Sequence, residues 1–268
     1  DVCSSDLINV RLKNKFLMES NNNQNLITNY SSISKINKKW TDKQRRIVWT
    51  LICKAHGPMQ VDLNPIVTTA FVILQFYFKN SQDCEFDLFT LMEAAIFISC
   101  KQSNCYRSIN TICSVLLQIC RSVNSKIIRA IPGNRINPDY NEVVKVTNAE
   151  MKLLNAIGFD MNIKLPFLYF DQIKDMICKE IPEEVSKSFC KHIFIDICLM
   201  ICSEYYLDLP PEVAVAAATE ESFQGIETPQ FITDWVAKIK SKYDSNTYNL
   251  AISSLTFEKT RTVFQKDF

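Results

Sequence analysis

The sequence of 268 residues has little glycine and little histidine. Its four Gly argue against a Gly-rich phosphate-binding loop and against a β-sandwich, and they suit helices joined by tight turns. The two histidines, His56 and His192, have no recognisable nucleophile framework beside them. Dinucleotide-binding, Walker, nucleophile-elbow and kinase signatures are all missing. We therefore expect a chain with no catalytic residues and no cofactor.

The sequence also lacks an excess of either charge and lacks a long apolar run. Lys and Arg number 30 and Asp and Glu number 29, so the formal net charge is +1. Proteins that bind nucleic acids usually carry a basic excess or a basic stripe, so direct nucleic-acid binding is disfavoured. The longest apolar run, from His192 to Cys202, is interrupted by Asp196 and is too short to cross a bilayer. Because no apolar signal-peptide core is evident either, we expect no membrane partner.

Cysteine is abundant, but its pattern is not that of a disulfide or zinc framework. The eleven Cys cannot all pair, and no Cys-x-x-Cys occurs. Six of them lie in apolar helical contexts: Cys53, Cys100, Cys113, Cys120, Cys198 and Cys202. We interpret these as small buried side chains in a reducing intracellular compartment, with no metal site. A helical metalloenzyme with zinc on Cys198, Cys202 and His192 is the alternative.

Helical periodicity and helix end signals divide the chain into an N-terminal extension and two sets of five helices. The extension, residues 1–39, comprises a helix over 6–19 and an Asn- and Ser-rich segment over 20–37. The first set occupies 40–163, with helices expected at 41–55, 66–79, 87–101, 108–121 and 138–157. The second set occupies 164–268, with helices expected at 167–178, 183–206, 211–223, 229–240 and 245–259. No strand-like alternation of useful length occurs, so we predict an all-α fold.

Two of these segments have no polar face. The first is FDLFTLMEAAIFISCK, from Phe86 to Lys101, in which Glu93 is the only charged residue between Asp87 and Lys101. The second is LDLPPEVAVAAATEE, which begins at Leu207. A helix that is apolar all round belongs in the middle of a bundle. Two such helices about 120 residues apart indicate two similar helical units in tandem, which favours a regulatory scaffold over an enzyme.

The expected helix over 138–157 carries an apolar stripe with a carboxylate on its edge. The stripe consists of Tyr140, Val143, Thr147, Met151 and Leu154. Because a carboxylate beside an apolar surface is costly unless it is paired, the edge at Glu150 is either solvated or met by a basic partner. Lys101 ends the central apolar helix, where a cation offsets the helix dipole. Alternatively, Lys101 and Glu150 come together and bind the backbone of a partner, which their sequence spacing does not decide.

Three other features have ordinary structural explanations. Gly57-Pro58 is expected to end the first helix of the first set, and Gly158 to close its last helix. Phe159, directly after Gly158, is interpreted as a side chain that plugs the core. Asp196, inside an apolar helix, is expected to form hydrogen bonds locally or across the bundle.

In order along the chain, these segments resemble the cyclin box. MEAAIFISCK, from Met92 to Lys101, is similar to the Ala-rich central helix of that family, which ends in Lys. EMKLL, from Glu150 to Leu154, and the following Gly158-Phe159-Asp160 resemble a later helix of the box. LQFYF at 74–78 and LPPEVA at 209–214 resemble the transcriptional cyclins C, K, L and T. The resemblance covers residues 40–225 well and the last forty residues weakly.

The resemblance implies two tandem five-helix cyclin boxes, at 40–163 and 164–268, after the extension at 1–39. It implies a non-catalytic subunit that binds and activates a cyclin-dependent protein kinase by packing on the kinase's αC helix. Lys101, Glu150, Leu154 and Phe159 match the family positions that contact the kinase around that helix.

The sequence departs from the family pattern in two places. Gln102-Ser103-Asn104 stands where many cyclins have an apolar residue and two acidic ones, which should weaken electrostatic matching with the kinase. Residues 45–49 do not preserve the Met-Arg-Ala-Ile-Leu patch of cell-cycle cyclins, which favours the transcriptional branch. By family analogy we expect a nuclear protein, with the transcription machinery as a further partner. A cell-cycle cyclin and a nucleic-acid-binding protein like the core of transcription factor IIB are the alternatives, and the latter predicts a basic face.

Overall fold

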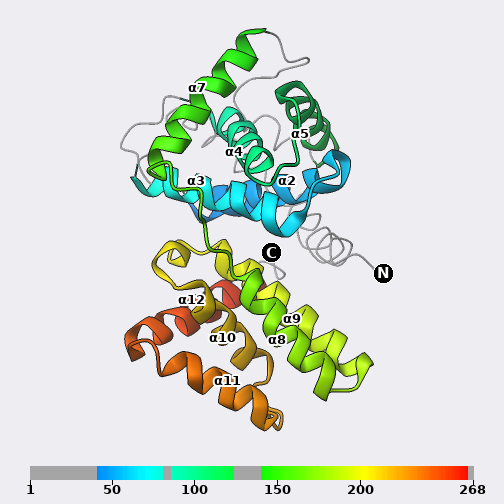
Figure 1. Cartoon of the computed structure of the whole chain (residues 1–268), viewed down its shortest axis with the longest axis vertical. Coiled ribbons are helices and arrows are strands. Elements are labelled where there is room, and N and C mark those ends of the chain that lie inside the picture. The colour runs from blue at the N-terminus through cyan, green and yellow to red at the C-terminus, as the bar shows by residue number, and fades with distance from the viewer. Residues whose placement is uncertain (1–40, 81–85, 124–139, 265–268) are drawn as a thin grey trace. The chain divides into compact units, whose positions relative to one another are not determined.

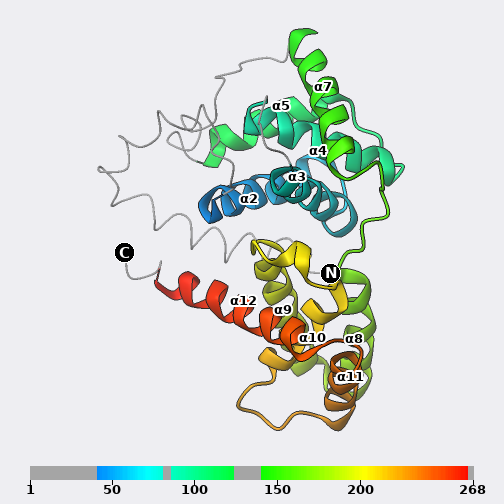
Figure 2. The ribbon, with the colours of Figure 1, turned by 90° about the vertical axis from the view of Figure 1, so that its left-hand side faces the viewer.

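The computed structural model describes residues 41–80, 86–123 and 140–264, and within these ranges all regular structure is helical. The expected all-α fold is confirmed. The expected helix at 6–19, the Asn- and Ser-rich segment at 20–37 and the first two residues of the helix expected at 138–157 lie outside the described residues. Two compact units meet in sequence between Ile163 and Lys164, and each is described by itself (Figures 1 and 2). No helix in the described part of the chain is long and apolar enough to cross a membrane.

The first unit is built around one helix that is buried on every side. Its helices are α2 (Asp42–Met59), η3 (Leu63–Val67), α3 (Thr68–Asn80), α4 (Leu88–Gln102), α5 (Ile109–Val123) and α7 (Tyr140–Ala156). Every side chain of α4 from Phe89 to Cys100 is buried, and α4 packs against α3, α5 and α7 (Figure 1). The prediction that this segment forms the central helix is confirmed.

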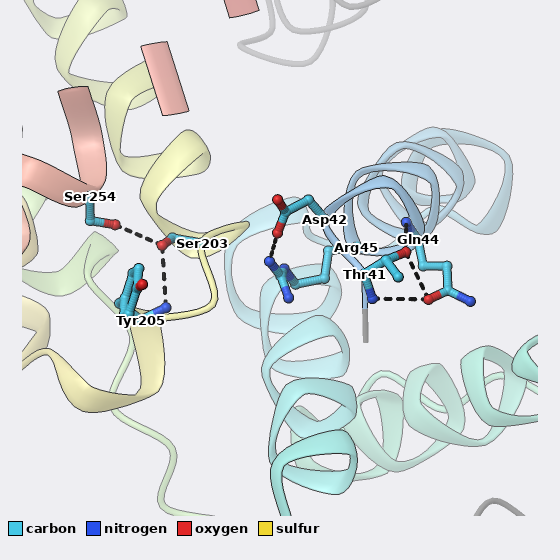
Figure 3. Close-up of polar contacts among 7 residues, drawn as sticks. All are labelled: Thr41, Asp42, Gln44, Arg45, Ser203, Tyr205 and Ser254. Atoms are coloured by element: carbon cyan, nitrogen blue, oxygen red, sulfur yellow. Dashed lines mark hydrogen bonds and ion pairs between the residues drawn. The ribbon is translucent and has the colours of Figure 1, made fainter. Parts of the chain in front are cut away.

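Capping residues fix where α2 and α4 begin. Asp87 accepts a hydrogen bond from the backbone N–H of Thr90, and its negative charge also interacts favourably with the positive end of the α4 dipole. Thr41 and Gln44 form a reciprocal capping box at the start of α2, next to the Asp42–Arg45 ion pair (Figure 3). The predicted start of the first helix at Thr41 is therefore correct.

The predicted end of that helix is wrong, because α2 continues through Gly57 and Pro58 to Met59. A residue before proline resists the helical conformation because the proline ring clashes with its backbone N–H and its Cβ, and glycine lacks the Cβ. Arg107 then binds the carbonyl groups at the helix end, with Nε 2.7 Å from the Met59 oxygen and Nη2 2.8 Å from the Gln60 oxygen. Both the missing Cβ and the guanidinium offset the cost of the proline.

The α7 helix ends in a turn that contains Gly158. The N–H of Phe159 donates to the Leu154 carbonyl oxygen at 2.8 Å, and the N–H of Gly158 donates to the Asn155 oxygen at 3.0 Å. These two bonds form a Schellman motif, in which the residue at the Gly158 position adopts a left-handed conformation. Gly158 has a φ of 63°, so the predicted helix stop is confirmed.

The second unit repeats the plan of a buried central helix. Its helices are α8 (Phe167–Glu180), α9 (Glu183–Ile201), η4 (Tyr206–Asp208), α10 (Pro211–Ser222), α11 (Gln230–Lys240) and α12 (Ser245–Phe264). The side chains of α10 from Val213 to Thr219 are all buried, and α10 packs against α8, α9, α11 and α12 (Figure 2).

The predicted single helix over 183–206 is interrupted, because α9 ends at Ile201. The Ser203 hydroxyl lies 2.7 Å from the Ser254 hydroxyl of α12 and 3.3 Å from the N–H of Tyr205 (Figure 3). A serine side chain that binds local backbone competes with helix continuation. Ser203 therefore holds the end of α9 against α12.

The cysteines predicted to be core thiols are all buried. Burial raises the pKa of the Cys100 thiol to about 11. Burial, with nearby Glu93 as the smaller cause, raises the pKa of the Cys120 thiol to about 12. These thiols stay protonated at neutral pH, so they act as small apolar side chains.

Asp196 forms an ion pair with another helix of the second unit. Of the two arrangements expected from the sequence, local hydrogen bonding or bonding across the bundle, the structure shows the second. Its Oδ2 lies 2.7 Å from Nζ of Lys259 on α12, and that Nζ lies 3.5 Å from a carboxylate oxygen of Glu221 on α10. Burial raises the pKa of the Asp196 carboxyl, and the bond from Lys259 opposes this shift. Lys259 therefore compensates a carboxylate that the core would otherwise reject.

We predict that Lys259→Ala destabilises the fold by about 2 kcal/mol at pH 7, less than the loss of a fully buried partner. Because the folded pKa of Asp196 is raised, its ionised form disfavours folding at neutral pH. That penalty disappears below the ordinary pKa of aspartate, where both states are protonated. The deficit of the variant should therefore shrink as the pH falls toward about 4. Urea unfolding followed by circular dichroism at several pH values measures it.

The matched control for that variant is Lys187→Ala, because Lys187 pairs with Glu183 where both side chains are exposed. Exposed pairs contribute little to stability, so this variant should unfold like the wild type. Two results would contradict the role of Lys259 in stabilising the Asp196 carboxylate. One is an equal loss of unfolding free energy in the two variants, and the other is a loss in Lys259→Ala that does not depend on pH.

At Gly158, we predict that alanine lowers stability by about 1 kcal/mol and asparagine by less. No atom outside the adjacent residues lies within 4 Å of a Cβ built there, so the cost is conformational rather than steric. Asparagine tolerates the left-handed conformation better than alanine does. Thermal unfolding of both variants tests this order, and an alanine variant as stable as the asparagine variant would refute it.

Candidate partner-binding surface

The structure brings Lys101 and Glu150 together. Lys101 lies in the last turn of α4 and Glu150 in the middle of α7, 49 residues apart in sequence. The Lys101 Nζ lies 2.7 Å from the Glu150 Oε1, with the two side chains 45% and 13% exposed, respectively. The carboxylate that the sequence places beside an apolar surface is therefore paired, and its partner belongs to the same unit.

The ammonium group of Lys101 is held from a second side by an aromatic ring. Its Nζ lies 4.1 Å from the ring centroid of Phe97, one turn earlier on α4. Phe97 in turn meets Tyr106 edge to face, with the ring centroids 6.3 Å apart. A cation over an aromatic face is attracted by the ring quadrupole. An ammonium has three N–H donors, so the pair with Glu150 leaves donors for another molecule.

The stripe predicted on α7 is not its core face. The buried side of α7 consists of Glu142, Val146, Ala149 and Leu153. In the predicted stripe, Thr147 and Met151 are exposed while Val143 and Leu154 are half-buried. Both sets have helical spacing, so the packing of α7 against α4 and α3 decides which set faces the core.

Phe159 is exposed, so the interpretation of this residue as a core plug is wrong. Leu153 is the last buried residue of α7, and the Schellman turn carries the chain beyond it before residue 159 is reached. In such motifs the side chains at the Leu154 and Phe159 positions frequently touch. The turn therefore brings these two predicted site residues to the same end of α7, on the helix that carries Glu150.

Three large side chains with unusual exposure accompany the ion pair: Tyr106 at 66%, Met151 at 53% and Phe159 at 56%. Together with Lys101, Glu150 and Leu154 they form what we call the Lys101 surface. The Phe97 ring connects Tyr106 to Lys101, and the bond from Gln102 to the Met161 carbonyl group links the segment after Phe159 to the end of α4. Single exposed apolar residues are ordinary, whereas aromatic and Met side chains are enriched in protein interfaces. The definition of this surface includes the four site residues predicted from the sequence.

Tyr106 is not among the site residues predicted from the sequence. A signal was available, because Tyr106 is the only aromatic residue in the otherwise polar stretch QSNCYRS that follows Lys101. The alternative zinc ligands are not assembled into a site either, since the described residues contain no group of three or more His, Cys, Asp or Glu that could hold a metal.

Comparison with known proteins gives structural likeness without sequence likeness. No protein-family model matches the sequence, and no curated protein matches it. Among solved structures, a viral cyclin from herpesvirus saimiri is similar with a TM-score of 0.54 and 14% identity, over 84% of this chain and 87% of that chain.

Two further structures are kinase complexes. A chain of the yeast RNA Pol II CTD kinase CTDK-1 complex is similar with a TM-score of 0.58 and 14% identity over 80% of this chain. A chain of the CAK complex from Chaetomium thermophilum, bound to ATP-gamma-S, is similar with a TM-score of 0.54 and 14% identity over 82% of this chain. The match spans 64% of each of those chains, which is less than two thirds. On this likeness, the chain has the cyclin fold.

Proposed function

We propose that this chain is a cyclin-like regulatory subunit that binds and activates a cyclin-dependent protein kinase through the Lys101 surface. The observation that carries the proposal is the Lys101–Glu150 pair, in which the half-exposed Lys101 is supported by Phe97, together with large exposed apolar side chains on the same elements. It lies at the positions where the cyclin resemblance places residues that contact a kinase, on a fold shared with a viral cyclin.

The chemistry of the pair suits recognition of a polypeptide backbone. Lys101 keeps N–H donors for carbonyl groups of a partner, and Glu150 keeps acceptor capacity for its N–H groups. Both charges are already oriented, so little side-chain entropy is lost on binding. Tyr106, Met151 and Phe159 supply apolar area of the kind that dominates interface energetics.

Activation follows from preferential binding to one state of the kinase. A subunit that packs on the αC helix in its inward position favours formation of the catalytic Lys–Glu pair of the kinase. The population shifts only by as much as the affinities for the two kinase states differ. In this proposal the chain contributes no catalytic residue, and its effect is conformational.

The finer assignment is a nuclear role in transcription, with the RNA polymerase II tail as the substrate of the bound kinase. LQFYF at 74–78 and the absence of the Met-Arg-Ala-Ile-Leu patch support the transcriptional branch. The likeness to a chain of the yeast RNA Pol II CTD kinase complex is compatible with this branch. The polar 102–104 turn reduces charge complementarity with the kinase, so apolar contacts should carry more of the affinity.

We predict that the double variant Lys101→Glu/Glu150→Lys loses about 100-fold in kinase affinity while it stays folded. The exchange keeps an internal ion pair but presents an acceptor where the partner needs a donor. A tagged wild-type chain is first used to purify its kinase, which is identified by mass spectrometry. The affinity of the recombinant kinase and its phosphate transfer to a polymerase-tail peptide are then measured with each variant.

The matched control is Lys242→Glu/Glu212→Lys in the second unit. That pair is separated by 3.2 Å and its side chains are 47% and 12% exposed, almost the same as at Lys101 and Glu150. The control should bind and activate the kinase like the wild type. If the folded Lys101/Glu150 double variant activates the kinase normally, the site assignment is wrong. If the wild-type chain associates with no cyclin-dependent kinase, the proposed function is wrong.

A further inference from the structure

Phe159 combines backbone strain with exposure. Its φ of 59° lies in the left-handed region, which is costly for a bulky side chain. Burial does not compensate that cost fully, because more than half of the side chain is exposed. Strained residues of this kind persist where the surrounding structure fixes them, and they concentrate at functional positions. The contacts on either side of Phe159 are therefore informative.

Two amide side chains from other helices hold the turn that carries Phe159. At the end of α3, Asn80 donates from Nδ2 to the carbonyl oxygen of Ala156 at 2.9 Å. At the end of α4, Gln102 donates from Nε2 to the carbonyl oxygen of Met161. One bond precedes Phe159 by three residues and the other follows it by two. The turn is thus attached to the helical core on both sides of the exposed ring.

Helix capping explains only one of these bonds. Ala156 is the last residue of α7, so its carbonyl group lacks a partner within the helix and Asn80 satisfies it. Met161 lies beyond the helix and beyond the Schellman turn, where no orphan helix carbonyl remains. The bond from Gln102 therefore fixes the path of the chain after Phe159 rather than the end of α7. Gln102 also directly follows Lys101, so the end of α4 supplies both a charge of the Lys101 surface and a support for Phe159.

We infer that Asn80 and Gln102 are positioning residues that preform Phe159 as an aromatic anchor for the kinase, an inference that rests on the proposed function. A ring already fixed in its bound position avoids the entropy loss of ordering the turn on binding. The two amides act on affinity through this turn, and they touch neither substrate nor nucleotide. Gln102 occupies the position where many relatives in the cyclin family have an apolar residue, so this support is a property of this chain.

The test uses four variants of the chain. Gln102→Met and Asn80→Ala remove the donors, Gln102→Lys keeps a donor of sufficient reach, and Phe159→Ala removes the ring. Amide hydrogen exchange at residues 159 and 160 is measured in the free protein. Affinity is then measured for the recombinant cyclin-dependent kinase that co-purifies with the wild type.

In both donor-deletion variants, we expect exchange at residues 159 and 160 to rise about tenfold while the melting temperature stays unchanged, because the opening is local. The dissociation constant should rise about tenfold in these two variants and about 100-fold in Phe159→Ala. The activity of the saturated complex should not change, since a positioning residue acts on binding. Gln102→Lys should restore both exchange and affinity.

Two results would overturn the inference: exchange that is unchanged in both donor-deletion variants, or faster exchange with wild-type affinity. The second of these leaves the proposed function intact, because the kinase still binds. A wild type that binds no kinase overturns the proposed function and the anchoring role with it. The exchange measurement on the free protein then still decides whether the two amides hold the turn.

Discussion

The architecture of both units depends on one constraint, which is that each contains a helix without a polar face. In α4 every side chain from Phe89 to Cys100 is buried, and in α10 the same is true from Val213 to Thr219. Such a helix cannot lie at a surface, so the neighbouring amphipathic helices must surround it. Apart from the buried Glu93, the charged residues of this segment lie at its ends, where Asp87 caps α4 and Lys101 follows the buried span.

The C-terminal ends of the two central helices carry opposite charges. The end of α10 carries Glu220 and Glu221, which the helix dipole disfavours, and lysines of α11 and α12 compensate both. The end of α4 carries Lys101, which the dipole favours, so Glu150 is not needed to tolerate it. The cation can therefore stay half exposed with donors to spare. The same arrangement of helices therefore gives glutamates neutralised by lysines of neighbouring helices in the second unit, and a partly exposed ion pair in the first.

The features that local pattern determines were predictable from the sequence. The two central helices follow from their lack of polar residues, and the stop at Gly158 follows from glycine's left-handed conformation. The core face of α7 was not predictable, because it competes with a second apolar stripe at the same spacing. The choice depends on how α7 packs against α4 and α3, which local spacing does not determine. The prediction of where α2 ends failed for a similar reason, since the residue that offsets the cost of Pro58 is Arg107, 49 residues away in sequence.

The candidate site likewise has features that the sequence predicts and features that depend on tertiary packing. Resemblance identified Lys101, Glu150, Leu154 and Phe159 as candidates, but the pairing of Lys101 with Glu150 depends on how α4 and α7 pack. Hydroxyl-radical footprinting tests the central claim most directly, because Tyr106, Met151 and Phe159 are exposed and reactive. We predict that these three side chains become protected when the kinase binds, while Leu168 and Phe257 of the second unit stay reactive. Protection of Leu168 and Phe257 with unchanged reactivity at the Lys101 surface would contradict the account.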